Sequence, residues 1–406
     1  MTHRFTRRAL LAGLGCTCCA GLLPTVAAAR VRPADMQPLV EPGYRPTEDD
    51  ERGMWQQYER FEEEIAGSNL LIRDPALASY VGGLVERVGG PAAQDLRIYL
   101  VQVPEFNAFM APTGFVVVFS GLMTRMRDEA QLSGVIAHEA GHFLRRHPLR
   151  RWRDIKRRTD LYTLLAFGAG LGGAATGMYL GNWVQLAGMG TMLTMAAYSR
   201  ELESEADAMG VRLLAENGYD PAAMPAVWQQ LIGELEASAE MRHRHRRAQS
   251  LLATHPAPET RMADLSISAA ELTDRSRSYD RGRDRWLAAI GPQRKRLLDD
   301  QVKLNDPGAS LYIIRNLAAD GWNGLLRFYE GEAWRLRGQA GDAELAAQSY
   351  AQATGFPDAP PEAWRAHGYA LATAGRREDG RLALARYLEL APNAPDAEMV
   401  RHALQQ

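Results

Sequence analysis

The chain comprises 406 residues, of which 46% are apolar and 24% are charged, and its formal net charge is −2 at pH 7. These values are ordinary for a globular protein and leave room for two or three domains. They exclude a strongly basic chain of the kind that binds nucleic acid through its overall charge, so we expect no nucleic-acid partner.

Residues 1–29 have the composition of an export signal peptide. Arg4 and the pair Arg7-Arg8 precede an uncharged apolar run that ends in Ala27-Ala28-Ala29. The arginine pair is typical of a twin-arginine signal, and a general secretory signal with the same basic start is the alternative. Cleavage near Ala29 would remove three arginines and no acid, which changes the net charge from −2 to about −5.

All three cysteines lie inside this predicted signal, at Cys16, Cys18 and Cys19. A mature chain that begins near residue 30 would therefore have no thiol and no disulfide, and its cores alone would stabilise it. Acylation of Cys16 is an alternative, but Gly13 stands where lipoprotein signals usually have leucine.

Residues 30–50 are rich in proline and acids and predict a flexible lead-in. Helical and extended patterns follow in turn. The expected helices are 54–65 and 75–88, and the expected extended segments are 97–103, 106–111 and 115–120. The extended segments predict a small β-sheet that packs against the next helix.

That next helix carries the string His138-Glu139-Ala140-Gly141-His142. Asp128 can cap its start, with Gln131 three residues later, and Pro148 is expected to end it. Residues four apart share one face of a helix, so His138 and His142 can bind one metal ion together. From the flank of that face, Glu139 can take a proton from a metal-bound water, which indicates peptide-bond hydrolysis.

A bare string of this kind also arises by chance, and a third ligand strengthens the interpretation. The helix that begins near Arg200 offers Glu203 and Asp207, which lie four residues apart. Glu203 can complete a site of two histidines and one glutamate, and Asp207 can accept the free ring N–H of His138. Glu201 and Glu205 point away from this face and are expected to be solvated.

Several short strings in this order resemble one known family. They are Asn107-Ala108-Phe109, Gly114-Phe115, Ser120-Gly121-Leu122, the segment from His138 to His142, and the segment from Ser199 to Gly210. Over about residues 50–265 the chain is similar to the zinc metallopeptidases of family M48, which include HtpX-like, CAAX prenyl-protease-like and BepA-like enzymes. The helical C-terminal part makes it most similar to the BepA-like members.

The resemblance implies a zincin-like peptidase domain that binds one Zn²⁺ per chain through His138, His142 and Glu203. Glu139 would be the general base, and Asp207 would match the aspartate that supports a ligand in the family. Asn107-Ala108-Phe109 would form the edge strand along which an extended substrate adds. Without the resemblance, these three residues are better explained as a turn-forming Asn and a core Phe.

Residues 161–199 contain eight glycines and no charged residue over 39 positions. A single membrane span would put His138 and Glu203 on opposite sides of a bilayer, so we expect an apolar helical hairpin over the cleft instead. The arginines and lysine of residues 145–158 are expected to form a solvated helix face, and peripheral membrane contact is the alternative.

His255 lies in a loop with Pro256 and Pro258, after a basic run at 242–247, and it again resembles the BepA-like pattern. In one interpretation it occupies the fourth metal position and keeps the peptidase latent until substrate displaces it. In the other it packs beside the cleft.

From about Gly324 the composition changes to small, apolar and basic residues at helical spacing. Two segments align at an offset of 34, which pairs Gly341 with Gly375, and Trp364, Gly368 and Pro392 fit the tetratricopeptide pattern. Helices between Leu265 and Gly321 are expected to extend the same α-solenoid, whose concave surface would bind peptides or partner proteins.

The sequence thus predicts a mainly α protein with a small sheet, of class α+β. The expected parts are the signal at 1–29, the lead-in at 30–50, the metallopeptidase domain at 51–265 and the helical repeats at 266–406. The leading hypothesis is a periplasmic zinc endopeptidase, peripheral to the outer membrane, that removes misfolded or misassembled envelope proteins and contacts the outer-membrane assembly machinery through the repeats. The alternative is a chaperone-like assembly adaptor with a latent metal site.

Overall fold

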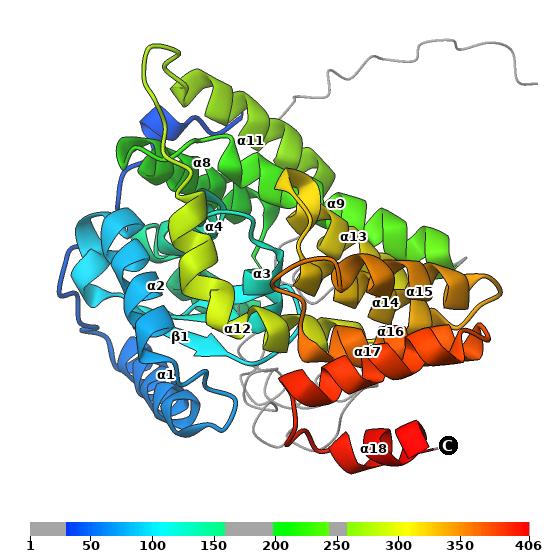
Figure 1. Cartoon of the computed structure of the whole chain (residues 1–406). Coiled ribbons are helices and arrows are strands. Elements are labelled where there is room, and N and C mark those ends of the chain that lie inside the picture. The colour runs from blue at the N-terminus through cyan, green and yellow to red at the C-terminus, as the bar shows by residue number, and fades with distance from the viewer. Residues whose placement is uncertain (1–29, 159–197, 243–257, 406) are drawn as a thin grey trace, which may run out of the picture. The chain divides into compact units, whose positions relative to one another are not determined.

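The computed structural model of the chain describes residues 30–158, 198–242 and 258–405 (Figure 1). This described part is mostly helical with one small sheet, which agrees with the predicted α+β class. The helices are α1 (Asp49–Gly67), α2 (Pro75–Val88), α3 (Ser120–Arg125), α4 (Glu129–Leu144), α5 (His147–Arg158), α8 (Arg200–Glu216), α9 (Ala223–Arg242), α11 (Pro258–Leu272), α12 (Arg283–Lys303), α13 (Pro307–Leu317), α14 (Gly324–Arg337), α15 (Asp342–Ala353), α16 (Pro361–Thr373), α17 (Arg377–Leu390) and α18 (Ala397–Gln405). Short 3-10 turns occur at Pro33–Asp35, Gly90–Asp95 and Ala318–Asp320.

The sheet has three strands in the order β1-β3-β2. Strand β1 (Arg97–Val101) runs parallel to β3 (Phe115–Phe119), and β2 (Ala108–Met110) runs antiparallel to β3. The three predicted extended segments are therefore confirmed, with β2 as an edge strand. Strand β3 has an uninterrupted apolar sequence because both of its faces are buried.

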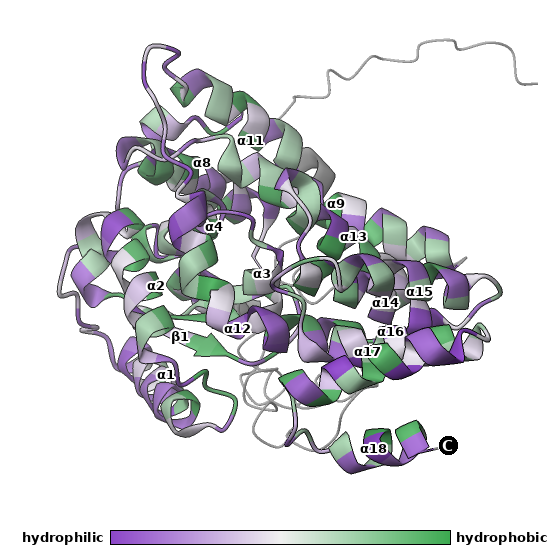
Figure 2. Ribbon diagram, viewed as in Figure 1, coloured by the Kyte–Doolittle hydropathy of each residue, from purple (hydrophilic) through white to green (hydrophobic). Residues whose placement is uncertain are grey.

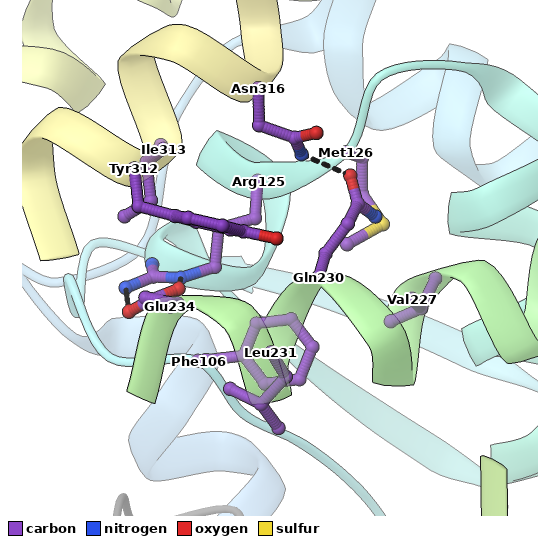
Figure 3. Close-up of a pocket in the computed structure, with 10 residues that line it drawn as sticks. All are labelled: Phe106, Arg125, Met126, Val227, Gln230, Leu231, Glu234, Tyr312, Ile313 and Asn316. Atoms are coloured by element: carbon purple, nitrogen blue, oxygen red, sulfur yellow. Dashed lines mark hydrogen bonds and ion pairs between the residues drawn. The ribbon is translucent and has the colours of Figure 1, made fainter. Parts of the chain in front are cut away.

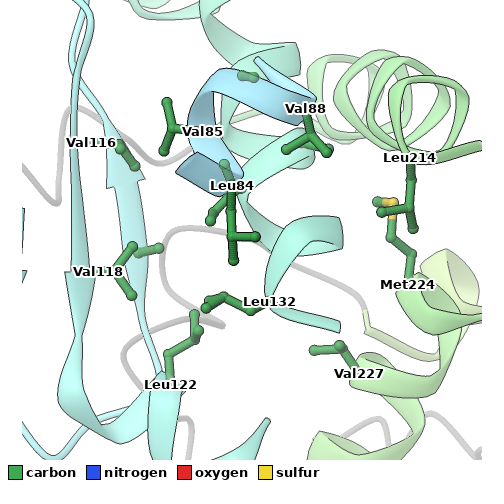
Figure 4. Close-up of a cluster of buried hydrophobic side chains, with 14 of the residues drawn as sticks. Leu84, Val85, Val88, Val116, Val118, Leu122, Leu132, Leu214, Met224 and Val227 are labelled. Atoms are coloured by element: carbon green, nitrogen blue, oxygen red, sulfur yellow. The ribbon is translucent and has the colours of Figure 1, made fainter. Parts of the chain in front are cut away.

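Two hydrophobic cores cover the two faces of β3. On one face Val116 and Val118 pack with Leu84 of α2 and Leu132 of α4 (Figure 4). On the other face aromatic and aliphatic side chains from β3, α1 and the start of α8 form a second cluster. The sheet thereby holds α4 in place from one side.

Helix α4 begins as predicted but ends earlier than predicted. The Asp128 carboxylate accepts a hydrogen bond from the Gln131 N–H at 2.9 Å, which caps the helix. The helix ends at Leu144, the backbone reverses at Arg146 with a positive φ of 56°, and α5 begins at His147. Pro148 was expected to stop α4. It lies instead in the first turn of α5, where proline is tolerated because its missing N–H needs no partner.

Helices α4 and α8 lie unusually close together because two glycines face the opposite helix. A Cβ atom on Gly141 would lie 2.9 Å from the Ala206 carbonyl oxygen, and one on Gly210 would lie 2.9 Å from the His138 nitrogen. Both contacts are with backbone, which cannot move aside. This approach carries the acidic face of α8 to the histidines of α4.

The N-terminal segment packs against these helices, in contrast to the expected flexible lead-in. Met36 and Val40 are buried in the main core. The Leu39 N–H donates to the Leu144 carbonyl oxygen at 2.7 Å, and Arg212 donates to that of Met36 at 2.6 Å. Proline and acidic content alone was a poor guide here, because two apolar residues four positions apart suffice to anchor the segment.

The expected boundary after residue 265 falls inside α11. Helix α12, expected to extend the repeat solenoid, contributes Trp286 and Ile290 to the core that contains α4. Helix α13 packs against α9, and the later helices form the pairs α14–α15 and α16–α17. Both members of the second pair carry hydrophilic and hydrophobic residues (Figure 2), as expected for helices that bury one face.

Gly341 and Gly375, 34 residues apart, both adopt a positive φ, of 85° and 80°, in the turn that joins the two helices of a pair. Equivalent turns at this spacing agree with the predicted period. The assignment of the pairs to tetratricopeptide repeats stays a prediction.

The predicted signal peptide with its cysteines, nearly all of the apolar segment 161–199 and the loop that contains His255 lie outside the described residues. Among the helices that are described, none combines the length and apolar character that a membrane span requires.

Candidate metal centre

His138, His142 and Glu203 meet at one buried point between α4 and α8. The two imidazole Nε2 atoms lie 3.1 Å apart. The Glu203 carboxylate oxygens lie 3.6 Å from Nε2 of His138 and 3.5 Å from Nε2 of His142. Within the described ranges, this is the one cluster of three or more such side chains close enough to hold a metal ion.

These distances fit a tetrahedral zinc ion. Nitrogen and oxygen donors about 2.0–2.2 Å from such an ion lie roughly 3.4 Å from one another. Two neutral imidazoles and one carboxylate are also a donor set that suits zinc and leaves a fourth position for water or substrate. The residues present therefore fit the metal that the sequence predicts.

His138 is supported on its outer side by Asp207. The Asp207 carboxylate oxygen lies 2.9 Å from Nδ1 of His138, which is the contact expected from the helical spacing. Burial opposes ionisation of Asp207, but the charge of Arg261 and the hydrogen bonds from Arg261 and His138 hold the pKa of this carboxyl well below its usual range. An ionised Asp207 can accept the His138 N–H and leave Nε2 facing the centre.

Arg261 of α11 joins both carboxylates of α8 and was missed in the sequence. Its Nη1 lies 2.6 Å from Glu203, and its Nε and Nη2 lie 2.8 and 2.6 Å from the two oxygens of Asp207. The guanidinium is buried and stacks on the Trp228 ring at 4.1 Å. Burial lowers the pKa of Arg261, but the two carboxylates outweigh that effect and raise it.

His142 is supported by a second histidine, His147, which was also missed. The Nδ1 atoms of the two rings lie 2.9 Å apart, and Nε2 of His147 lies 3.2 Å from the Glu205 carboxylate. Arg145 and Arg150 each contact that carboxylate at 2.9 Å. The expectation that Glu205 is solvated is therefore wrong, because α5 covers this side of α8.

The titration of this support follows from its contacts. The hydrogen bond from His147 lowers the pKa of Glu205 to about 2, with help from Arg150 and Arg145 and against the effect of burial. Burial lowers the pKa of His147, against the raising effect of Glu205, so the ring is neutral at pH 7. Tyr198 stacks on the His142 ring at 4.0 Å and 19°, and burial raises the pKa of its hydroxyl well above the usual value.

The basic run after α4 is less solvated than predicted. Arg145 and Arg150 contact Glu205, and Arg146 and Arg153 lie 3.1 and 3.5 Å from the buried Glu51. These residues pair with acids of the same domain. Glu201, in contrast, is exposed as expected.

Glu139 and His138 open onto an apolar cavity of about 410 Å³, a volume that includes the part open to solvent. Ala108 of the edge strand lines the same cavity. The other lining residues are Phe106, Leu122, Gly134, Val135, Met224, Val227 and Trp228. Of the predicted edge-strand residues, Ala108 thus faces the cavity, while Phe109 packs in the aromatic core and the buried Asn107 side chain has no hydrogen-bond partner among the described residues.

A second cavity of about 260 Å³ shares Phe106 and Val227 with the first (Figure 3). It contains a buried ion pair in which Arg125 donates to both oxygens of Glu234 at 2.6 and 2.7 Å. The pair joins α3 to α9. It therefore fixes the far wall of the apolar cavity.

His255, the predicted fourth ligand, lies outside the described residues, so the structure does not place it. Of the residues missed in the sequence, His147 offered a signal as a third histidine close behind the first two. Arg261 offered less, because a single arginine in a helical pattern predicts no contact.

Comparison with known sequences places this centre in context. Residues 72–269 match the sequence profile of Peptidase family M48. The chain is 32% identical over 214 residues to the Beta-barrel assembly-enhancing protease of Escherichia coli (strain K12), which covers 52% of this chain and 42% of that protein. It is 31% identical over 224 residues to the mitochondrial Metalloendopeptidase OMA1 of Bos taurus, which covers 52% and 40%. The matches thus span about two fifths of the length of these relatives.

Proposed function

Residues 72–269 form a domain of peptidase family M48, and from this premise we propose that the protein is a zinc-dependent endopeptidase of the bacterial periplasm. The observation that carries the proposal is the meeting of three metal donors, one further carboxylate and an apolar cavity at a single point beside an edge strand. Such a site is suited to bind an extended peptide and hydrolyse it.

We propose that His138, His142 and Glu203 hold one zinc ion per chain. When bound there, zinc would supply Lewis acidity toward a water and a substrate carbonyl. Asp207 keeps the proton of His138 on Nδ1, so that Nε2 is available as a donor. Arg261 fixes the orientation of Glu203 and balances part of the negative charge of the site.

Glu139 is the proposed general base. It follows His138 directly in α4 and lines the cavity together with it. Its carboxylate would take a proton on one oxygen and then deliver that proton to the nitrogen of the leaving amine. The apolar walls around Glu139 exclude bulk water and favour this transfer over exchange with solvent.

The proposed substrates are unfolded or misassembled segments that can lie extended along β2. This strand has a free edge among the described elements, and main-chain pairing with such an edge needs no particular sequence. The cavity beside Glu139 would then take one large apolar side chain next to the cleaved bond. Folded proteins bury such side chains, so the cavity favours damaged clients.

The proposed setting is the cell envelope. A relative from Escherichia coli carries the name Beta-barrel assembly-enhancing protease, and the N-terminal 29 residues resemble an export signal. The helix pairs from α14 onward would recruit clients or the outer-membrane assembly machinery as tetratricopeptide repeats do, with peripheral membrane contact. His255 is the proposed fourth ligand that keeps the centre latent.

Metal content and casein cleavage of the purified chain test the proposal, with Glu139→Gln as the matched variant. We expect about one zinc per chain in both forms, and cleavage that falls roughly 10²- to 10⁴-fold in the variant. Full zinc content without cleavage in any form would favour the assembly adaptor instead. A chain that binds no zinc would overturn the proposal.

A further inference from the structure

The proton positions around His142 follow from its place at the centre. The nitrogen that faces the other donors is Nε2, 3.1 Å from His138 and 3.5 Å from Glu203. A neutral imidazole that binds a metal through Nε2 carries its proton on Nδ1. The Nδ1–H of His142 therefore needs an acceptor, and Nδ1 of His147 lies 2.9 Å away.

His147 can accept this bond in only one tautomer. If its Nδ1 accepts, its own proton is on Nε2, and that atom lies 3.2 Å from the Glu205 carboxylate. The opposite direction would place a proton on Nε2 of His142 and remove it as a ligand. The chain therefore runs from His142 through His147 to Glu205, with a donor and an acceptor at each link.

The position of His147 is enforced by the backbone and by charge. The reversal at Arg146 sets His147 at the first position of α5, directly behind His142, where its side chain is fully buried. Arg145 and Arg150 hold Glu205 from outside at 2.9 Å each. A carboxylate with two arginines stays ionised and keeps accepting from the ring.

We propose that His147 is a positioning residue that orients His142 for the metal by accepting its Nδ1 proton. This inference rests on the proposed function only in taking His142 as a metal ligand. The two ligand histidines are then supported differently. His138 donates directly to a carboxylate, whereas His142 reaches one through a second imidazole.

Two amide substitutions separate this role from simple packing. In His147→Asn the side-chain oxygen stands near the former Nδ1 and can still accept from His142. In His147→Gln the amide stands near the former Nε2 and can still donate to Glu205, but the inner bond is lost. His147→Leu fills the space and keeps neither bond. His367→Leu, at a half-buried histidine of α16, is the control for loss of a histidine elsewhere.

The readouts are zinc affinity by chelator competition and the visible absorption of the Co²⁺-substituted full-length chain, and neither requires proteolysis. We expect His147→Leu and His147→Gln to bind zinc about 10- to 100-fold more weakly, with altered Co²⁺ bands. His147→Asn should stay close to the wild type, and His367→Leu should match it. Thermal melting of the chelated forms identifies any variant that does not fold, and if His147→Leu is among them the Asn and Gln forms decide.

Unchanged zinc affinity in His147→Leu, or equal loss in the Asn and Gln variants, would overturn the proposal. If the wild type binds zinc but cleaves no protein, the proposed function fails while the order of affinities still tests the role of His147. Absence of zinc binding in the wild type would overturn both.

Discussion

Nη1 of Arg261 lies 2.6 Å from Oε2 of Glu203, and the same guanidinium binds Asp207 through two further nitrogens. One buried cation thus joins a metal donor to the residue that supports another donor. Removal of a single partner from such a buried network leaves charge without compensation, which usually costs more than the network contributes as a whole.

We therefore predict that Arg261→Met destabilises the chelated protein by about 3–5 kcal/mol. Saturating zinc should reduce this loss, because the metal also compensates the carboxylates of Glu203 and its surroundings. Urea unfolding with and without zinc measures both values. Arg327→Met, which removes a guanidinium stacked on Trp322 far from the centre, should show no dependence on zinc. Equal losses with and without metal would contradict the prediction.

A second prediction concerns the approach of α4 and α8. In Gly210→Ala the new Cβ would meet the backbone of His138 at 2.9 and 3.0 Å, so the helices must separate. We expect a loss of about 1–3 kcal/mol in stability and weaker zinc binding, measured by urea unfolding and chelator competition.

The matched control for this variant is Gly82→Ala in α2, where an added Cβ meets nothing within 4 Å. There the change removes backbone freedom from the unfolded chain and should stabilise the protein by about 0.5–1 kcal/mol. Similar effects at both positions would show that helix separation is not the cause.

A third prediction concerns the cavity beside Glu139. The wild type should cleave peptides next to large apolar residues, because six of the lining side chains are aliphatic or aromatic. Val135→Phe fills this space from α4 and should lower kcat/KM for such peptides by at least about 10-fold. Peptides with alanine at that position should be affected less.

Cleavage of a peptide library followed by mass spectrometry measures this preference. Ile267→Phe adds the same ring at a half-exposed position of α11 and should leave the preference unchanged. Cleavage sites with no enrichment of apolar residues would refute the assignment of the cavity to substrate.

A fourth prediction concerns pH and Glu129, in the first turn of α4. Burial raises the pKa of this carboxyl, but hydrogen bonds from Arg285, Tyr219 and Tyr80 outweigh burial and lower it. A group with a lower pKa in the folded state stabilises the protein above its unfolded pKa of about 4.3, and that contribution disappears as the pH falls through the folded value.

Glu129→Gln should therefore be less stable than the wild type at pH 7, and the difference should shrink as the pH falls below about 4. Urea unfolding at pH 7 and at pH 3.5 measures the two differences in unfolding free energy. Glu398→Gln, at an exposed position of α18, should change neither value. A difference that stays constant between the two pH values would exclude this origin.

The parts of the centre that the sequence predicted well depend on spacing within one helix. His138 with His142, and Glu203 with Asp207, are four residues apart, so their shared faces follow from the helical period alone. The three extended segments followed in the same way from runs of β-branched and aromatic residues. These features need no knowledge of how distant segments meet.

The features that the sequence did not predict depend on such meetings. Arg261 reaches Glu203 because α11 crosses α8, and His147 reaches His142 because the chain reverses at Arg146. Glu205 was assigned to solvent from its helical position, but α5 covers that face. Pro148 is compatible with a helix end and with a first turn, and only the reversal before it decides between them.

The contact of α4 with α8 at Gly141 and Gly210 is made by main-chain atoms, so neither helix can slide closer or yield without loss of packing. The three donor atoms are consequently held at a separation that belongs to the backbone and not to the reach of side chains. An ion such as Ca²⁺, with bonds of about 2.3–2.6 Å, would need a wider and more crowded shell than this frame offers. The two glycines thus make the centre a gauge of ionic radius, and selectivity by size follows from the fold itself.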